Sequence, residues 1–366
     1  MITVDFSAPE ALQLGLVGGK TLGLAKMTQN GMSVAPGFAV TTEAHKAFLQ
    51  RTGINARVGA ILISHRVRDS AALAEAAELI EAEFAAASVP DDIATEIRRG
   101  YEQLAERLGI PDVSVAVRSS ATAEDTAESS FAGEYETYVG VTGADDVVEY
   151  VKRCWGSAFT PHAIAYAIDR GLSPLEVSMA VVVQKTVKAR ASGVMFTLSP
   201  TTGDRSRIVI EASWGLGLAV VGGEVSPDRF AIDKITLGVI DKKLGNKRIE
   251  YVDSHTSREV EDERLGVFCL SEEEAVTIAR LGKALERLNK VPQDIEFAVD
   301  RELQGPDNVV LLQCRPETVW SAKQSEGSTT ESVPLMDRIT TSVFGVATGT
   351  VAAPKKSTLP RSRKHG

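Results

Sequence analysis

Four polar residues in two apolar segments carry the most specific chemical signal in the sequence. They are Asp294 and Glu296 in the segment DIEF, and Gln313 and Arg315 in the segment LLQCRP. Because side chains alternate along a strand, each pair would lie on one face. If the two strands are neighbours, the shared surface could hold a hard divalent ion through oxygen ligands while the guanidinium neutralises a phosphate. A solvent-facing polar strand face is the less favoured alternative.

Two further segments suit the binding of an anion. Segment 115–139 predicts a strand that delivers Arg118 into a run of small hydroxyl residues, whose backbone N–H groups could approach a phosphate. Gly18 and Gly19 precede Lys20 at a predicted helix start, which would combine close backbone approach, the helix dipole and a mobile cation. Each has an ordinary alternative, a surface salt bridge for Arg118 and a capped surface helix for Lys20. The glycine spacing does not match the Walker A pattern.

Two other segments could complete a nucleotide site. Gln184 and Lys185 follow an apolar strand and could offer polar groups to an adenine edge, or the strand could simply end at the surface. Glu211, in the segment EASWGLG, could reach a metal ion or a ribose, and the glycines after it would allow a loop to close over a ligand. The alternative for that segment is a packed turn formed by Trp214 and Gly215.

The elements that must position these residues are a mixture of helices and strands. The first hundred residues are predicted to be mostly helical, and the apolar spacing over 93–108, followed by Gly109, predicts a helix with a glycine C-cap. Helical sequence also covers 145–169, and a capping box at Ser271 begins a helix that runs to about residue 288. Short β-branched segments predict strands at 113–117, 179–183, 207–210 and 309–312.

Length and composition limit the class of protein. The 366 residues suggest two or three compact units, and 43% hydrophobic with 24% charged residues is ordinary globular composition. The longest apolar run is too short to span a membrane, and the first residues lack the pattern of a secretory signal. The net charge of −9 argues against a general nucleic-acid binder, and three scattered cysteines argue against a disulfide framework. We therefore expect a cytoplasmic protein.

Taken together, these segments resemble the nucleotide-binding part of the family of phosphoenolpyruvate synthase, pyruvate phosphate dikinase and rifampicin phosphotransferase. The similar segments follow the family's order: GGKTLGLAKM, VAVRSSATAED with SSFAGEYETYV, SGVMFTLSP, EASWGLG with VSPDRFAIDK, and DIEFAVD with LLQCRPET. They cover about residues 10–320. The resemblance implies an α+β ATP-grasp fold in two lobes, with ATP and Mg²⁺ between them. It also implies transfer of the β-phosphate to a histidine on a separate swivelling domain, with release of AMP.

The resemblance also implies a division of the chain. Four parts are expected: a mainly helical part with the Lys20 loop at 1–110, a first ATP-grasp lobe with the Arg118 phosphate loop at 111–200, a second lobe with the metal and phosphate strands at 201–320, and a linker with a basic tail at 321–366. Residues 345–351 in the last part resemble the opening strand of the swivelling domain.

Individual roles follow from the matching motifs. Lys20 and Arg118 would bind the phosphates and Arg315 would hold the transferring phosphate, so these three are the expected catalytic residues. The other implied positions are Gly133 and Thr137 in the closing loop, Gln184 at the adenine, Asp294 beside the site, and Glu296 with Gln313 on Mg²⁺. Lys185 and Glu211 remain nucleotide-binding candidates on the chemistry given above.

Two departures from the family pattern bear on function. The segment FTPHAIAYA lacks both arginines of the usual F-T-x-R-A-I-x-Y-R, and His162 within it is expected to be a helical surface histidine. Only 51 residues follow Arg315, whereas a swivelling domain needs roughly 100 and an acceptor barrel about 250. None of the five histidines has the Gly-rich Thr-Ser-His context of the family's phosphate carrier.

We therefore expect an ATP-dependent phosphotransferase subunit that phosphorylates a histidine on a partner protein. Its architecture most resembles the ATP-binding subunit of phenylphosphate synthase, so the small-molecule acceptor, bound by the partner, would be phenol or a related aromatic alcohol. The alternatives are a component of a split phosphoenolpyruvate synthase or antibiotic phosphotransferase, a fragment of a longer chain, or a nucleotide-sensing module without turnover. Binding to nucleic acid or a membrane is not expected.

Overall fold

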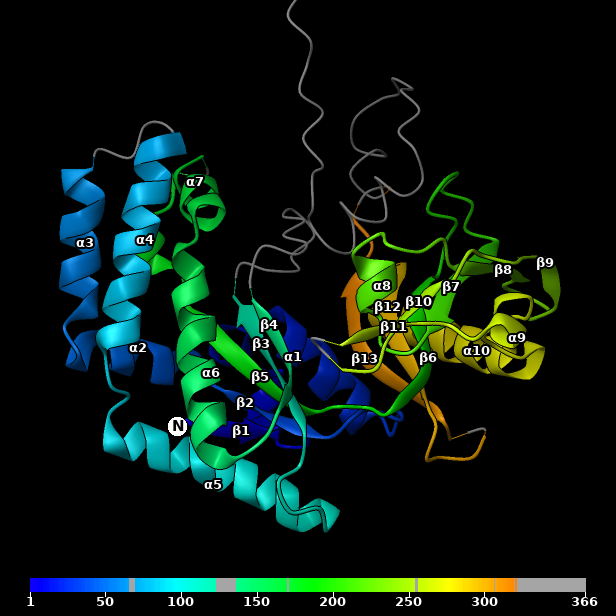
Figure 1. Cartoon of the computed structure of the whole chain (residues 1–366), viewed down its shortest axis with the longest axis horizontal. Helices are drawn as coiled ribbons and strands as arrows, with labels where there is room; N and C mark the ends of the chain where they lie inside the picture. Colours follow the sequence, from blue (N-terminus) through cyan, green and yellow to red (C-terminus); the bar gives the residue numbers. More distant parts are fainter. Residues whose placement is uncertain are drawn as a thin grey trace, which may run out of the picture.

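Two antiparallel sheets, each with its own helices, form two lobes that lie side by side (Figure 1). The computed structural model describes residues 1–65, 70–122, 136–169, 171–253, 256–305, 307–318 and 320. The predicted linker and tail at 321–366 lie outside these residues. No helix in the described part of the chain is long and apolar enough to cross a membrane.

The first lobe is built on a five-stranded sheet. Its strands, in spatial order, are β1 (Thr3–Asp5), β2 (Gly37–Val40), β5 (Met179–Lys185), β3 (Val115–Ala121) and β4 (Thr137–Val141). One face packs on an apolar cluster contributed by the surrounding helices, which explains why alternate residues of β3, Val115 and Val117, are buried there. The intervening residues of β3 lie on the opposite face, where Ser120 contacts α1 and Arg118 reaches the second lobe.

In the described part of the chain, seven α-helices and three short 3₁₀ helices belong to this lobe. They are η1 (Pro9–Leu12), α1 (Leu14–Gln29), α2 (Thr42–Arg51), α3 (Ile54–Ser64), α4 (Ser70–Ala86), α5 (Asp91–Leu108), α6 (Ala144–Gly156), η2 (Ser157–Phe159), α7 (Pro161–Asp169) and η3 (Pro174–Glu176). The predicted glycine C-cap is confirmed, since Gly109 ends α5 in the left-handed conformation. The helical segment 145–169 is two helices, because Thr160 is extended and Pro161 begins a new helix.

The second lobe is built on a six-stranded sheet. Its strands, in spatial order, are β13 (Val309–Pro316), β12 (Gln293–Asp300), β6 (Ala189–Phe196), β7 (Arg207–Trp214), β8 (Asp228–Asp233) and β9 (Val239–Lys243). The remaining elements are the ribbon β10 (Ile249–Tyr251) with β11 (Ser257–Glu259) and the helices α8 (Leu218–Val221), α9 (Asp262–Leu265) and α10 (Glu272–Asn289). The predicted capping box at Ser271 is confirmed at the start of α10.

Helix α10 covers one face of this sheet and thereby fixes which residues face the first lobe. The apolar residues Ile295, Phe297 and Met195 pack in the cluster that includes α10. Asp294 and Glu296, which flank Ile295 along β12, point to the opposite side, because successive side chains of a strand alternate between its faces. The sheet therefore has an apolar face toward α10 and a polar face toward the first lobe.

A chain crossing and helix α1 both join the two lobes. The chain crosses from β5 to β6 between Lys185 and Ala189, earlier than the predicted lobe boundary at residue 200. Helix α1 contacts β3 and β5 of the first sheet and also β13 of the second. The approach is close, since an ideal Cβ at Gly23 would lie 2.6 Å from the carbonyl oxygen of Cys314. The N-terminal part of the chain thus packs at the junction of the two lobes.

Candidate active site

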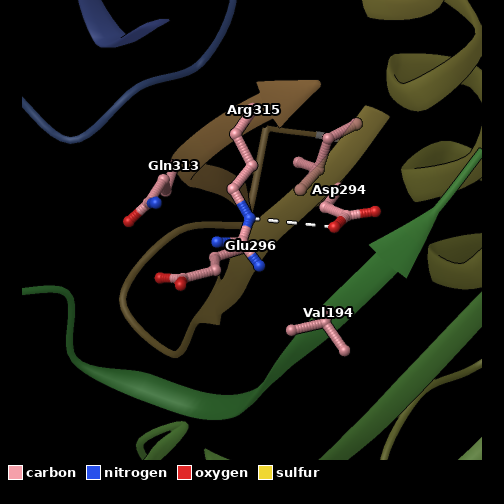
Figure 2. A pocket seen from close by; sticks show the side chains of 6 residues that line it. Val194, Asp294, Glu296, Gln313 and Arg315 are labelled. Atoms are coloured by element: carbon pink, nitrogen blue, oxygen red, sulfur yellow. Dashed lines mark ion pairs between the residues drawn. The ribbon is translucent and has the colours of Figure 1, made fainter. Parts of the chain in front are cut away.

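The four polar residues of β12 and β13 lie together, as their spacing predicted. Asp294 pairs with Arg315 and Glu296 pairs with Gln313 in the antiparallel register, so all four share the polar face of the second sheet. The Arg315 Nε lies 3.7 Å from the Asp294 Oδ2, and both side chains are buried. Figure 2 shows the Glu296 and Gln313 side chains pointing the same way, with Asp294 on the other side of Arg315.

Arg118 reaches this group from the first lobe. Its Nη2 donates hydrogen bonds to the Gln313 Oε1 at 2.8 Å and to the Glu296 Oε2 at 3.2 Å. Its Nε is buried and has no hydrogen-bond acceptor among the described residues. The fold therefore joins predicted phosphate and metal residues that are separated by 178 and 195 positions in the chain.

The Gly18–Lys20 segment is held against β3 by a kink in α1. Gly18 has a φ of +73°, and an ideal Cβ there would lie 1.9 Å from the Ser120 carbonyl oxygen. The Thr21 N–H donates to the Ser120 Oγ at 3.2 Å, and the Lys20 Nζ donates to the Ser119 carbonyl oxygen at 3.0 Å. Lys20 thus contacts the backbone of the residue that follows Arg118, and the helix starts anew after Gly18.

This close approach makes Gly18 a sensitive position for stability. We expect Gly18→Ala to lower the free energy of unfolding by about 3 kcal/mol, because a side chain there is strained by its φ and collides with backbone. Gly15→Ala is the matched control, since nothing lies within 4 Å of an ideal Cβ at Gly15. Urea unfolding followed by circular dichroism measures both variants, and equal stabilities would contradict the packing described here.

The remaining candidate residues of the first lobe differ in the face of the sheet on which they lie. Thr137 begins β4 directly opposite Arg118 in the register, and Gly133 lies outside the described residues. Gln184 shares the Arg118 face of the sheet but is buried, and its Nε2 donates to the Ala35 carbonyl oxygen at 3.0 Å. Lys185 follows it on the opposite face of β5, paired with Val115. The structure therefore brings Gln184 and Thr137 to the Arg118 face and leaves Lys185 on the other.

An apolar cluster that the sequence did not reveal lies at the junction of the two lobes. It contains Ala35, Val187, Ala189, Ala298 and Val310, with Leu216 and Leu312 packed against it. These residues come from both lobes and from the segment that connects them. No local signal identifies them, because small aliphatic residues are common at every buried position.

Glu211 lies on the same polar face of the second sheet, two strands away from Glu296. In the register Glu296 pairs with Val194, Val194 with Glu211, and Glu211 with Arg229. Glu211 is only 2% exposed, and its Oε1 lies 3.9 Å from the Arg229 Nε. Burial raises the pKa of Glu211 to about 7, against the opposing effect of Arg229. Arg229 was not predicted as a site residue. Its only signal in the sequence is its place in the segment VSPDRF, which is part of the family resemblance.

The raised pKa of Glu211 predicts a pH dependence of stability. The unfolded carboxyl titrates near 4.5, so between about pH 4.5 and 7 the folded protein binds more protons than the unfolded chain. Stability contributed by protonated Glu211 is therefore lost progressively as the pH rises from about 4.5 to about 7, by on the order of 3 kcal/mol. Glu211→Gln should remove this loss and be the more stable protein at pH 8. Urea unfolding from pH 5 to 8 tests this, and parallel pH profiles would contradict it.

Glu296 and Gln313 suit a hard divalent cation. Each offers an oxygen donor on the same face of adjacent strands, and both donors already face a positive charge, the Arg118 guanidinium. No cluster of three or more His, Cys, Asp or Glu residues in the described part of the chain could hold a metal ion. The donor set thus fits an ion such as Mg²⁺, which takes one or two protein ligands and completes its shell with phosphate oxygens and water.

The centre of the site is filled by its own side chains. A pocket lined by Val194, Asp294, Ile295, Glu296, Gln313 and Arg315 encloses about 10 Å³, which is about the space of one water molecule. A triphosphate therefore requires the Arg118 and Arg315 side chains to move or the lobes to part.

The three described histidines, His45, His65 and His162, are not among the residues that meet at this centre. His162 is exposed on α7, which confirms the prediction of a helical surface histidine. His45 is buried beside Trp155, and burial lowers its pKa to about 3, so it stays neutral at physiological pH. His255 and His365 lie outside the described residues.

Comparison with known proteins gives a family match over most of the chain. The family described as "Pyruvate phosphate dikinase, AMP/ATP-binding domain" matches residues 14–333. A probable phosphoenolpyruvate synthase from Staphylothermus marinus is 42% identical over 337 residues, covering 85% of this chain and 40% of that protein. The phosphoenolpyruvate synthase of Aeropyrum pernix is 40% identical over 345 residues, covering 86% and 42%. The chain thus spans about two fifths of the length of these relatives.

Among solved structures, a similar chain is D-alanyl-alanine synthetase A from Vibrio cholerae. It is 11% identical, with a TM-score of 0.24, over 68% of this chain and 63% of that one. The family match covers most of the present sequence and includes every candidate residue named above. The chain therefore belongs to the pyruvate phosphate dikinase AMP/ATP-binding domain family, as the resemblance of its motifs predicted.

Proposed function

We propose that this chain binds Mg²⁺-ATP between its two lobes and transfers the β-phosphate to a histidine of another domain or subunit, with release of AMP and phosphate. The observation that carries the proposal is the meeting of Arg118 with Glu296 and Gln313 across the lobes, at 3.2 and 2.8 Å respectively. A phosphate and a metal ion bound there would touch both lobes at once, as the reaction requires.

The distribution of charge supports phosphoryl transfer. Lys20 and Arg118 approach from the first lobe and Arg315 from the second. Phosphoryl transfer depends mainly on positioning and on neutralising the phosphate oxygens, which is what three cations and a divalent ion supply. A nucleotide sensor without turnover would not need Arg315 in addition to the metal donors, so we favour an enzyme.

The junction between the lobes is where we place the adenine base of ATP. The apolar cluster that contains Ala35, Val187 and Ala298 is buried where the lobes meet, and Gln184, on the same sheet face as Arg118, donates to the Ala35 carbonyl oxygen there. Nucleotide pockets are mostly apolar with a few polar groups that fix orientation. In this proposal the adenine packs there and the phosphates extend toward Glu296.

The acceptor of the phosphate is the finer part of the proposal. The relatives named above are called phosphoenolpyruvate synthases, which favours phosphoenolpyruvate as the product of the complete system. Phenol, through an architecture like that of phenylphosphate synthase, is the second candidate, with an antibiotic as the third. In each case the histidine and the acceptor site belong to a partner subunit or to another domain.

A labelling experiment tests the proposal. The protein is incubated with β-labelled ATP, Mg²⁺ and histidine-bearing proteins encoded near its gene, and AMP and acid-labile labelled protein are measured. We expect a partner to accelerate AMP release and to become labelled. Adding pyruvate or phenol then shows which acceptor removes the label. The proposal fails if no partner is labelled and AMP release is never accelerated while the protein binds ATP.

A further inference from the structure

The Arg118 guanidinium occupies the position of a cation in this structure. Its Nη2 contacts both oxygen donors assigned to the metal, the Glu296 Oε2 and the Gln313 Oε1. The Arg118 and Glu296 side chains are 15% and 23% exposed, so water screens their attraction only in part. The metal donors are therefore satisfied by a charge that the protein itself provides.

A divalent ion and this guanidinium compete for the same two oxygens. A metal ion bound at about 2.1 Å from each oxygen would come close to the Arg118 Nη2, and the two positive groups would repel each other. A metal ion that arrives alone must displace Arg118 and leave its guanidinium without the carboxylate. Binding of the free ion is therefore opposed by the residue that holds the site closed.

Resting on the proposed function, we propose that Arg118 holds the cation position until a metal–polyphosphate complex arrives, so that this site takes the divalent ion together with the phosphates and not alone. The phosphate offers Arg118 a new anionic partner, and the metal ion takes over Glu296 and Gln313. Each charged group exchanges one counter-charge for another, and none is left buried without one.

Two observations indicate that Arg118 is prepared for this exchange. Its Nε is buried without an acceptor among the described residues, whereas a phosphate could accept from both Nε and Nη2 in the usual bidentate geometry. Among the described residues, Glu296 and Gln313 are the two oxygen donors assigned to the metal ion, and no cluster of three or more His, Cys, Asp or Glu residues could hold one. Phosphate oxygens would therefore complete the coordination as well as release the arginine.

Metal binding without nucleotide tests the inference. Free Mn²⁺ is titrated against the full chain and followed by electron paramagnetic resonance, for the wild type, Arg118→Met and Arg98→Met. Arg98 is the matched control, since it forms an exposed ion pair with Asp145 on the outer side of the first lobe. We expect Arg118→Met to bind Mn²⁺ at least about tenfold more tightly than the wild type, and Arg98→Met to match the wild type.

The affinity for ATP should change in the opposite direction. Without added metal, Arg118→Met should bind ATP at least about tenfold more weakly than the wild type, because it loses a charged phosphate contact. A residue with a merely structural role would weaken both ligands together. The double variant Arg118→Met with Glu296→Gln should lose the gain in Mn²⁺ affinity, which locates the ion at Glu296.

Two results for the Mn²⁺ affinity would overturn the inference. Mn²⁺ affinity that is unchanged or lower in Arg118→Met, or a gain that survives Glu296→Gln, contradicts it. If Arg118→Met does not fold, as judged by circular dichroism, Arg118→Gln decides, since its neutral amide lacks the charge that competes with the ion and should still raise Mn²⁺ affinity. Failure of the wild type to bind ATP would refute the proposed function, whereas the nucleotide-free Mn²⁺ comparison tests Arg118 by itself.

Discussion

Arg315→Ala is expected to lower the rate of phosphotransfer by about 10³-fold while ATP still binds. The side chain is buried on the polar face, beside the residues assigned to the metal ion, and its charge would act on the phosphate that is transferred. Quench-flow measurement of AMP release with the histidine-bearing partner gives the rate, and isothermal titration gives the affinity for ATP.

The same substitution also disturbs an ion pair, so a control is needed. Arg315 lies 3.7 Å from the buried Asp294, and its loss removes a counter-charge from that carboxylate. The double variant with Asp294→Asn should recover stability without recovering transfer. Arg207→Ala, at an exposed position at the start of β7, should behave as the wild type. A transfer rate that survives in Arg315→Ala would remove Arg315 from the mechanism.

Glu296→Gln combined with Gln313→Leu is expected to abolish the Mg²⁺ dependence of ATP affinity. In the wild type we expect Mg²⁺ to tighten ATP binding at least about tenfold, because the ion links the phosphates to the second lobe. The double variant lacks the carboxylate and the amide oxygen on adjacent strands, so Mg²⁺ should change its ATP affinity little.

Titration of each protein with ATP, with and without Mg²⁺, measures this difference. Glu302→Gln is the control, since Glu302 forms an exposed ion pair with Lys188 on the same lobe. If the variant still binds ATP more tightly with Mg²⁺, to the same extent as the control, the assignment of the metal to Glu296 and Gln313 is wrong.

Local patterns in the sequence predicted much of the second lobe correctly. Alternation alone placed Asp294 with Glu296 and Gln313 with Arg315, and the register shows that these strands are neighbours. The helix caps at Gly109 and Ser271 were also predicted, because capping depends on residues within one turn. Strands β6 and β8 of the second sheet were not predicted from alternation. Both strands are buried on both faces, so their polar and apolar residues do not simply alternate.

Burial changed the meaning of residues that the sequence had left ambiguous. Gln184 could have marked the end of a strand at the surface, yet it is buried and donates to the Ala35 carbonyl oxygen. Glu211 was a candidate on chemistry alone, and its raised pKa follows from its burial in the folded protein. Solvent exposure depends on every neighbouring element, so no short segment encodes it.

The sequence by itself determined the family, the residue types of the site and the strand faces on which the metal donors lie. Those properties depend on motifs and on the two-residue period of a strand. Only the tertiary structure decided that Arg118 contacts Glu296 and Gln313, that Gly18 must lack a side chain, and that both lobes supply the apolar cluster. Such contacts join residues more than a hundred positions apart, and packing of the two sheets, not local propensity, brings them together.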